Sequence, residues 1–387
     1  MADVYDVVVI GAGIVGSATA YSLAKTSYKT LLLEQFALPH TRGSSHGQSR
    51  ITRKAYVQDY YAKMMPEAYD LWDTLERETG TQLYLKTGMV MFGNPTSPAL
   101  INTEKALQKM KSSYQSLSPG QLESRFGQFK MPPQYHGLYD QEAGILKSHR
   151  GLVAYQTVFQ RNGGKLIDEV KVGKIIPGEI VTLQTNKGEF RARSVVVAAG
   201  PWTSKLTQPL GFHIPLKPVR VSVNYWKETN PGEFGSEKFP CFIKPADEHF
   251  DYDLYGLPAD EYPNCVKICL HIGPEIDPDE RDKDKTSSWD IDMVKRFIRK
   301  FTPSLNDDPC IVEKCIYTMT PDEDFVIDSH PHWKNIVVGA GFSGHGFKLA
   351  PVTGKLLAEL ATGRHTSYDT KPFRLERFLK PNQASKL

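Results

Sequence analysis

The chain has 387 residues, of which 40% are hydrophobic and 24% are charged, a composition typical of globular proteins that bury a core. Its 47 basic and 44 acidic residues leave a net charge of only +3, which excludes a general nucleic-acid-binding surface. No apolar run reaches the roughly 18 residues that a membrane-spanning helix needs.

The first 34 residues predict a strand, a glycine turn, a helix and a second strand. Residues 5–10 are an apolar, β-branched run that indicates a buried strand, and Gly11, Gly13 and Gly16 follow it in GAGIVG. The next strand ends at Glu34, 23 residues after Gly11. Glycines let the backbone approach a pyrophosphate at a helix N-terminus, and the acid binds ribose hydroxyls. This context predicts a dinucleotide site; the alternative is a tight strand–helix turn without a ligand.

The rest of the chain mixes parallel-type and antiparallel-type patterns. We expect a loop at 38–50, a helix at 60–78, a strand or hairpin at 83–92, a capped helix after Ser118, a buried strand at 194–202, a half-buried antiparallel strand at 219–225, a helix at 291–301, and a strand at 335–347 that leads into a helix. Parallel-type strands at the start, middle and end predict one discontinuous α/β domain, into which an antiparallel domain is inserted.

A second GxGxxG motif, GAGFSG, occupies residues 339–344. Only 43 residues follow Gly344, and no strand that ends in an acid lies about 20 residues further on. A second nucleotide-binding unit is therefore excluded, and we expect a glycine-lined helix start at Gly344–Phe347 that faces the far end of the same cofactor. One nucleotide unit closed by N- and C-terminal pieces favours FAD over NAD.

Two short segments concentrate polar residues that could do chemistry. GSSHGQSRITR contains His46, Ser49, Arg50 and Arg53. A helical turn would place the two arginines on one side, whereas a solvated basic loop is the alternative.

The segment NCVKICLHI alternates, so that one strand face carries Cys265, Lys267, Cys269 and His271. Strand positions four apart lie about 13 Å apart, too far for one tetrahedral zinc ion with bonds of about 2.3 Å. We interpret this face as a cavity wall, with an exposed edge strand as the alternative. Tyr255, Tyr317 and Lys348 are further, isolated polar candidates.

The motifs together resemble the monomeric sarcosine oxidase family of FAD-dependent amine oxidases, including N-methyltryptophan oxidase and the peroxisomal sarcosine and L-pipecolate oxidases. The similarity covers essentially the whole chain, and its most specific segments are LPHTRGSSHGQSRITRKAY, CIYTMTPDEDFVID and GAGFSGHGFKLAPV. The resemblance implies oxidation of a secondary or cyclic amino acid, sarcosine or L-pipecolate, to an imine, with oxygen reduced to hydrogen peroxide. The alternatives are an FAD amine dehydrogenase with a protein electron acceptor and a non-catalytic flavin-fold binding protein.

The resemblance also implies a fold and a domain division. The fold is α/β, with a Rossmann-type FAD domain of the glutathione-reductase kind and an inserted antiparallel-sheet substrate domain. The FAD domain takes residues 1–84, 148–216 and 318–387, and the substrate domain takes 85–147 and 217–317. Residues 94–147 carry no motif from which a role can be assigned.

Individual roles follow from the same resemblance. Cys315 would carry the flavin through an 8α-S-cysteinyl bond, Arg53 and Lys348 would hold the substrate carboxylate, Lys267 would activate oxygen, and Arg50 would lie near the flavin. The substrate cavity would be surrounded by His46, Tyr255, His271 and Tyr317. The FAD site would include Gly11, Gly13, Gly16, Glu34, Ser49, Val172, Gly344, Gly346 and Lys348. Ser49 stands where some bacterial members have threonine.

The two ends of the chain predict its location. The N-terminus lacks the basic start of a signal peptide, and the five cysteines, few and odd in number, suit reduced thiols in an intracellular compartment. Ser385–Leu387 reads Ser-Lys-Leu, the address that the peroxisomal import receptor binds. We expect a peroxisomal monomer whose partners are this receptor, an amino-acid substrate and oxygen, with no metal, membrane or nucleic acid.

Overall fold

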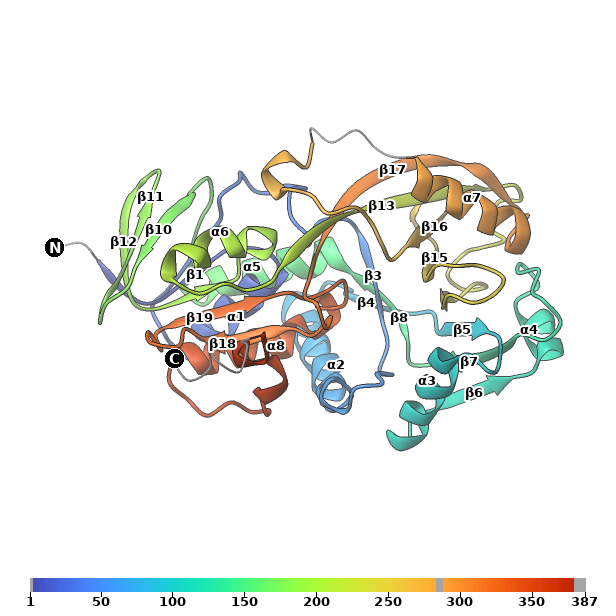
Figure 1. Cartoon of the computed structure of the whole chain (residues 1–387), viewed down its shortest axis with the longest axis horizontal. Coiled ribbons are helices and arrows are strands. Elements are labelled where there is room, and N and C mark those ends of the chain that lie inside the picture. The colour runs from blue at the N-terminus through green and yellow to red at the C-terminus, as the bar shows by residue number, and fades with distance from the viewer. Residues whose placement is uncertain (1–2, 283–287, 379–387) are drawn as a thin grey trace.

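A computed structural model describes residues 3–282 and 288–378 of the chain, and three β-sheets organise it (Figure 1). The α-helices in the described part are α1 (Ile14–Lys25), α2 (Asp59–Thr79), α3 (Pro98–Lys109), α4 (Pro119–Arg125), α5 (Ser148–Arg161), α6 (Thr203–Thr207), α7 (Trp289–Phe301) and α8 (Ala350–Ala361). Short 3-10 helices are η1 (Gly200–Trp202), η2 (Gln208–Leu210), η3 (Pro278–Glu280), η4 (Phe347–Leu349), η5 (Lys371–Phe373) and η6 (Leu375–Phe378). The helices predicted near 60–78, after Ser118 and at 291–301 are confirmed.

The first sheet contains the predicted nucleotide-binding strands. Its members are β1 (Val4–Ile10), β2 (Thr30–Leu33), β9 (Lys165–Ile167), β10 (Val172–Ile176), β11 (Val181–Thr185), β12 (Gly188–Val197), β18 (Val326–Ser329) and β19 (Ile336–Ala340). The strands β9, β2, β1, β12 and β19 are parallel in that spatial order, whereas β10, β11 and β18 are antiparallel additions. Chain segments from the start, middle and end thus meet in one sheet, as predicted.

Strand β1 is apolar throughout because both of its faces are covered. Val7 and Val9 pack with the helices α1, α2, α5 and α8, while Val8 and Ile10 face a separate core that includes residues of β10 and β11. A Cβ atom on Gly354 of α8 would lie only 2.7 Å from Ala18 of α1. The two helices therefore approach closely where α8 carries no side chain, which fixes α1, and with it the glycine turn, against the sheet.

The second sheet lies in the other half of the molecule (Figure 1). Its strands, in spatial order, are β17 (Leu305–Met319), β13 (Lys217–Glu228), β16 (Cys265–Leu270), β15 (Leu254–Tyr262), β14 (Cys241–Lys244), β5 (Met89–Gly93), β7 (His136–Asp140) and β6 (Tyr114–Leu117). All neighbours are antiparallel except β14 and β5. The long pair β13–β17 runs from the middle of the molecule along this half.

Strand β13 is antiparallel as predicted, but the expectation that it is half exposed is wrong. Arg220, Ser222 and Asn224 are buried like Val221 and Val223, with which they alternate. Val221, Val223 and Tyr225 pack in one apolar cluster, whereas the following Trp226 joins the core that contains α7. Because both faces are covered, the polar side chains of β13 are enclosed. Strand β16 lies between β13 and β15 with all its residues buried, so the edge-strand alternative is also wrong.

A small third sheet joins the two halves and contains β3 (Ser49–Thr52), β8 (Gly144–Lys147) and β4 (Tyr84–Lys86), in that order. Residues 83–92 form no hairpin, because β4 pairs with β8 while β5 pairs with β7 and β14. The loop predicted at 38–50 ends two residues earlier, because Ser49 and Arg50 already belong to β3 and pair with β8. The division into two domains at the predicted boundaries stays a prediction.

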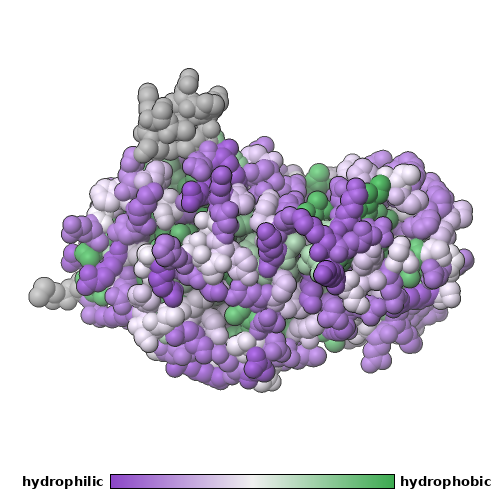
Figure 2. Space-filling view, turned by 90° about the horizontal axis from the view of Figure 1, so that it is seen from below, coloured by the Kyte–Doolittle hydropathy of each residue, from purple (hydrophilic) through white to green (hydrophobic). Residues whose placement is uncertain are grey.

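The surface seen in Figure 2 is mostly hydrophilic, and its hydrophobic residues form small separate patches. Within the described ranges, every helix is too short or too polar to span a membrane. The predicted peroxisomal address, Ser385–Leu387, lies outside the described residues.

Candidate active site

A cavity of about 430 Å³ opens at the end of the first sheet where β1 and β2 lead into their loops. Its wall brings together segments that are far apart in the sequence. The predicted site residues that line it are Gly11, Gly13, Glu34, His46, Arg50, Val172, Tyr317, Gly344 and Gly346. Both glycine-rich motifs therefore face one cavity, as predicted for a single cofactor.

The first motif requires glycine for two geometric reasons. Gly11 has a φ of +101°, which L side chains rarely adopt, and a Cβ there would lie 2.5 Å from the Ala198 carbonyl oxygen. A Cβ on Gly16 would lie 1.9 Å from the Gly11 carbonyl oxygen. Gly16 does not line the cavity; its part is to let α1 pack closely on the turn.

The N-terminus of α1 faces this cavity with unsatisfied backbone donors. Gly13 is the N-cap residue and provides no side-chain cap, and the first turn contains no acid. The Ser45 hydroxyl accepts a hydrogen bond from the Ile14 amide at 2.9 Å, which ties the 38–48 loop to the helix start. The remaining amides and the helix dipole suit an anionic group such as a pyrophosphate.

Glu34 lies directly after β2 and is buried. One carboxylate oxygen accepts a hydrogen bond from the Ala12 amide at 2.9 Å, and the other accepts one from the Phe36 amide at 3.1 Å. His40 Nε2 lies 3.3 Å from the same carboxylate. The carboxylate is thus fixed at the cavity wall, where it can accept further bonds from ribose hydroxyls.

The second motif reaches the opposite end of the cavity. Gly344 has a φ of +77°, and a Cβ there would lie 2.7 Å from His271 and 2.9 Å from Tyr317. The predicted helix start at Gly344–Phe347 is displaced: a 3-10 helix begins at Phe347 and α8 only at Ala350. The glycines therefore make room for aromatic side chains, and the turn rather than an α-helix N-terminus faces the cavity.

Arg50 and Arg53 do not share a helical turn, so that expectation is wrong. Arg50 lies in the extended strand β3, and Arg53 follows the last residue of that strand, so no helical turn contains them. The Arg50 guanidinium donates to the carbonyl oxygens of Ser44 at 2.9 Å and His46 at 2.6 Å. These bonds hold Arg50 in the wall of the cavity, whereas Arg53 does not line it. The solvated-loop alternative does not apply to Arg50.

His46 lies beside Arg50 with each ring nitrogen near a carbonyl oxygen. Nδ1 is 2.6 Å from the Gly43 oxygen and Nε2 is 2.8 Å from the Lys314 oxygen. Burial, helped by the Arg50 charge, lowers the pKa of His46 to about 4. The ring is therefore neutral at pH 7, and only one of its nitrogens donates a hydrogen bond.

Arg53 and Lys348 meet on the far side of the glycine turn. The Arg53 guanidinium carbon is 5.2 Å, and the Lys348 ammonium 5.3 Å, from the ring centroid of Tyr56. Their hydrogen bonds go to the carbonyl oxygens of Ala55 at 2.6 Å and His345 at 3.3 Å. Burial and then the charge of Arg53 hold the pKa of Lys348 well below its ordinary value.

Three aromatic side chains lie between these cations and the cavity. The hydroxyls of Tyr255 and Tyr317 are 3.4 Å apart, and the rings of His271 and Tyr317 are 5.1 Å apart between centroids. Burial lowers the pKa of His271; Asp253 opposes the shift, and Lys348 and Arg53 increase it. Because His271 is neutral, these three aromatic side chains add no further positive charge beside Arg53 and Lys348. They therefore suit contact with a small amine-containing molecule.

Cys315 lies on β17 with its thiol buried. Its sulfur is 3.9 Å from the Ser44 carbonyl oxygen, and the residues Ser44, Ile316 and Tyr317 beside it all line the cavity. Cys315 itself is behind this wall. Arg50 and Arg281 both interact electrostatically with its sulfur.

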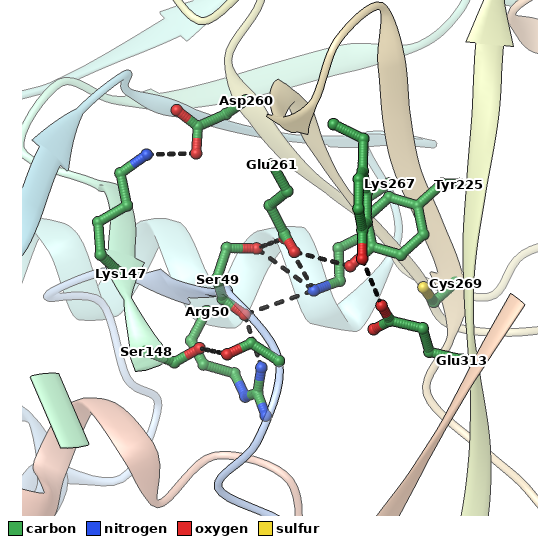
Figure 3. Close-up of polar contacts among 12 residues, drawn as sticks. Ser49, Arg50, Lys147, Ser148, Tyr225, Asp260, Glu261, Lys267, Cys269 and Glu313 are labelled. Atoms are coloured by element: carbon green, nitrogen blue, oxygen red, sulfur yellow. Dashed lines mark hydrogen bonds and ion pairs between the residues drawn. The ribbon is translucent and has the colours of Figure 1, made fainter. Parts of the chain in front are cut away.

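Lys267 on β16 enters the site from the second sheet (Figure 3). Its ammonium is 3.3 Å from the Ser49 hydroxyl and 3.4 Å from the Ser49 carbonyl oxygen, next to Arg50. It also forms an ion pair of 3.1 Å with Glu261. Among the described residues, no group of three acid, histidine or cysteine side chains could hold a metal ion.

A sequence model of the FAD-dependent oxidoreductase family matches residues 6–360. The chain belongs to this family of FAD-dependent oxidoreductases. Peroxisomal sarcosine oxidase of Homo sapiens is 46% identical to it over 379 residues, and the alignment covers 97% of each chain. Monomeric sarcosine oxidase of Bacillus sp. (strain NS-129) is 34% identical over 391 residues, which cover 100% of each chain. Among solved structures, the open form of NikD, an unusual amino acid oxidase essential for nikkomycin biosynthesis, is 25% identical with a TM-score of 0.84 and covers 96% of this chain and 97% of NikD.

The residues around the cavity of this FAD-dependent oxidoreductase fit FAD. A glycine turn without room for a Cβ and a helix N-terminus suit the pyrophosphate, and the fixed Glu34 carboxylate suits the adenosine ribose. The second glycine turn and Arg50 stand at the other end of the same cavity, where the flavin ring would lie. The cavity volume is within the range of small-molecule sites.

Sequence reasoning missed Glu261, which precedes the β15–β16 turn of this oxidoreductase. A signal for it was present. Pro263 and Asn264 mark a hairpin turn, and Asn264 has the φ of +57° that such turns favour. The hairpin brings an acid back over the lysine that follows, and a buried lysine needs such a counter-charge. Tyr56, the ring shared by the two cations, had no comparable signal.

Proposed function

We propose that this oxidoreductase oxidises secondary or cyclic amino acids, with sarcosine and L-pipecolate as candidate substrates, to an imine and produces hydrogen peroxide. The printed names of its relatives support the substrate class, since sarcosine oxidases are joined by the N-methyl-L-tryptophan oxidase of Citrobacter koseri, 30% identical over 380 residues. When bound, FAD supplies the two-electron chemistry that links the C–H bond beside the amine to oxygen.

The observation that carries the proposal is a pair of cations beside the cofactor cavity, the partly buried Arg53 and the buried Lys348. Neither forms an ion pair with a residue in the described ranges. The two positive charges also repel each other, since the charge of Arg53 lowers the pKa of Lys348. An amino-acid carboxylate would accept charge-assisted hydrogen bonds from both. The same carboxylate would favour the charged form of Lys348, so that binding of the substrate and protonation of the lysine support each other.

The cations would also set the protonation of the substrate amine. A secondary amine is mostly an ammonium ion in water, yet only the free amine has an electron pair available beside the reacting carbon. Arg53 and Lys348 disfavour a further positive charge nearby, and the pKa of His271 is already lowered by burial and by these two cations. The site would therefore bind the free amine of the substrate.

The aromatic residues would define the size of the substrate. Burial raises the pKa of Tyr255 well above its ordinary value, so its hydroxyl stays neutral and can donate a hydrogen bond. Tyr255, His271 and Tyr317 cluster against the Gly344 turn. We expect a short N-methyl amino acid or a single ring to bind beside this cluster, which would shield the reacting carbon from water.

Lys267 would act in the reaction with oxygen. Its ammonium is buried and contacts Ser49, whose neighbour Arg50 lines the cofactor cavity. A fixed positive charge in a site from which water is excluded stabilises negative charge that develops on oxygen. This role does not require contact with the amino acid.

We further propose that FAD is attached covalently to Cys315. The thiol lies directly behind cavity-lining residues, and two cations, Arg50 and Arg281, are close to its sulfur. A thioether at this place would fix the flavin end of the cofactor between the two glycine turns.

The location and organisation of the enzyme complete the proposal. A peroxisomal location is supported by the name of the human relative and by the terminal Ser-Lys-Leu, which an import receptor would bind. We propose that the enzyme is a monomer with an FAD domain and an inserted substrate domain at the predicted boundaries.

One peroxide assay across four substrates tests the activity. Purified enzyme with sarcosine, L-pipecolate, L-proline and N-methyltryptophan should release hydrogen peroxide with at least one secondary amino acid. Substrate-dependent dye reduction without peroxide would instead indicate a dehydrogenase with another electron acceptor. A colourless protein that is inactive in both assays would indicate a binding protein and contradict the proposal.

A further inference from the structure

We propose that Glu261 is the positioning residue of Lys267: it keeps the ammonium charged and fixes it against β3, beside the cofactor cavity. The inference rests on the proposed role of Lys267 in the reaction with oxygen. Glu261 is not among the site residues expected from the sequence, and its side chain does not line the cavity.

The pair is buried and short. The Lys267 ammonium and a Glu261 carboxylate oxygen are 3.1 Å apart, and both side chains are only 4% exposed. Lys267 comes from β16 and Glu261 from β15, two strands joined by the Pro263–Asn264 turn. The register of the two strands shifts between Leu257–Lys267 and Tyr262–Cys265, and this irregularity brings Glu261 beside the lysine.

The carboxylate is itself held from three directions (Figure 3). One oxygen accepts hydrogen bonds from Lys267 and from the Ser49 hydroxyl of β3. The other accepts a hydrogen bond from the Tyr225 hydroxyl of β13 at 2.7 Å. Because four strands supply the four groups, neither the carboxylate nor the ammonium can shift without breaking bonds, and Ser49 ties both to the residue next to Arg50.

The electrostatics favour an ionised pair. Burial raises the pKa of the Glu261 carboxyl, but the Lys267 charge and hydrogen bonds from Ser49 and Tyr225 outweigh it, so this pKa lies below its ordinary value. An ammonium without the carboxylate would remain in the interior with only neutral partners. Such an ammonium gives up its proton at a lower pH, because burial disfavours the charged form.

Other charged and titratable groups lie around the pair on the surrounding strands. They are Arg50 on β3, Lys147 on β8, Tyr225 on β13, Cys241 on β14, Asp260 on β15, Cys269 on β16 and Glu313 on β17. Asp260 pairs with Lys147, and Glu313 accepts a hydrogen bond from Tyr262 at 2.7 Å. Among the described residues, Glu261 is thus the carboxylate that contacts the Lys267 ammonium.

Asp260 provides a matched control, since it carries the same charge one residue earlier on the same strand. Asp260→Asn removes that charge but leaves the Glu261–Lys267 pair intact. A change that follows Glu261→Gln and not Asp260→Asn is therefore specific to the pair.

The test measures flavin reoxidation by oxygen in stopped flow between pH 6 and pH 9 for the purified, flavin-loaded variants. Glu261→Gln should slow reoxidation at least tenfold at pH 9 and recover towards the wild-type rate at pH 6, where Lys267 regains its proton. Anaerobic reduction by substrate should change less than threefold across this range. Asp260→Asn should follow the wild-type pH profile.

Thermal unfolding provides a measurement that does not depend on turnover. Glu261→Gln should lower the Tm of the flavin-loaded enzyme, because it leaves a buried ammonium without its counter-charge. In a Lys267→Met background, the same substitution should lower the Tm far less. If Glu261→Gln alone does not yield folded protein, rescue of folding by Lys267→Met supports the inference, and failure of that rescue overturns it.

Two outcomes separate this inference from the proposed function. If Lys267→Met leaves reoxidation unchanged, the oxygen role of Lys267 is wrong and this inference is overturned with it. If Lys267→Met slows reoxidation but Glu261→Gln slows it equally at all pH values, or not at all, the oxygen role stands and the positioning role of Glu261 is overturned.

Discussion

Arg53, which is partly buried, and Lys348, which is buried, place two positive charges beside one phenol ring. Both lie within 5.3 Å of the centroid of Tyr56, one from the residues after β3 and the other from the 3-10 turn before α8. Neither charge is neutralised by a carboxylate in the part of the chain that the structure describes. Two like charges so close are costly, and an anionic substrate group would remove that cost.

Truncating either cation should weaken binding of a small carboxylate. A lost charge-assisted hydrogen bond costs about 1.5–3 kcal/mol, so Arg53→Ala or Lys348→Met should raise the Kd of methylthioacetate by roughly ten- to a hundredfold. A flavin absorbance titration measures this Kd. Lys54→Ala is the control, because Lys54 faces Glu142 and the ring of Tyr69 instead. An unchanged Kd for Arg53→Ala would contradict the proposed role.

The flavin should remain on the protein after denaturation. Acid-precipitated wild-type enzyme should stay yellow, and Cys315→Ser should release its flavin into the supernatant. Cys310→Ser removes an exposed thiol five residues earlier on the same strand and should retain the flavin. Release of all flavin from the wild-type precipitate would show that the attachment is not covalent.

Lys267→Met should separate the two halves of the catalytic cycle. We expect flavin reoxidation by oxygen to slow by about 10²–10³-fold, the loss typical of one preorganised electrostatic contact, while anaerobic reduction by substrate changes far less. Stopped-flow absorbance measures both rates. An equal loss in the two steps would mean that Lys267 only maintains the structure or positions the cofactor.

The free energy of unfolding should fall as the pH drops from about 6.5 to about 4. Burial lowers the pKa of His46 to about 4 and that of His345 to about 3. Below pH 6.5 the unfolded chain binds protons on these rings that the folded chain does not bind, so stability increases with pH in this window. Each ring adds at most about 1.4 kcal/mol per pH unit.

Urea unfolding at several pH values measures this slope. His345→Asn should flatten it, because one of the proton differences between the folded and unfolded states is lost. A slope that is the same in His345→Asn and in the wild type would show that this histidine does not contribute.

Deletion of Ser385–Leu387 should move the enzyme from peroxisomes to the cytosol without changing its specific activity. The tag used for imaging must be N-terminal, since the receptor reads a free C-terminus. The control is the tagged full-length chain, which should appear as points that coincide with a peroxisomal marker. An even cytosolic distribution of that full-length chain would count against the address.

The nucleotide-binding unit could be predicted from the sequence because its information is local. The strand, the glycine turn, the helix and the acid all lie within the first 34 residues, and each residue type follows from backbone geometry or charge at that place. The same holds for the capping box at Ser118, whose side chain bonds to Gln121 three residues later. The pairing of the two glycine motifs in one cavity needed only the observation that the second motif lacks a nucleotide unit of its own.

Tertiary structure alone decided which charges are neutralised and which remain available. The sequence does not show which partner Lys267 or Lys348 has. In the structure β15 brings a carboxylate to Lys267, while the turn before α8 places Lys348 beside Arg53 and an aromatic ring. It also decided that β13 is buried on both faces and that β3 is extended. Apart from the Glu261–Lys267 pair, which one hairpin brings together, these outcomes depend on contacts between segments far apart in the sequence, and local propensity carries no information about such partners.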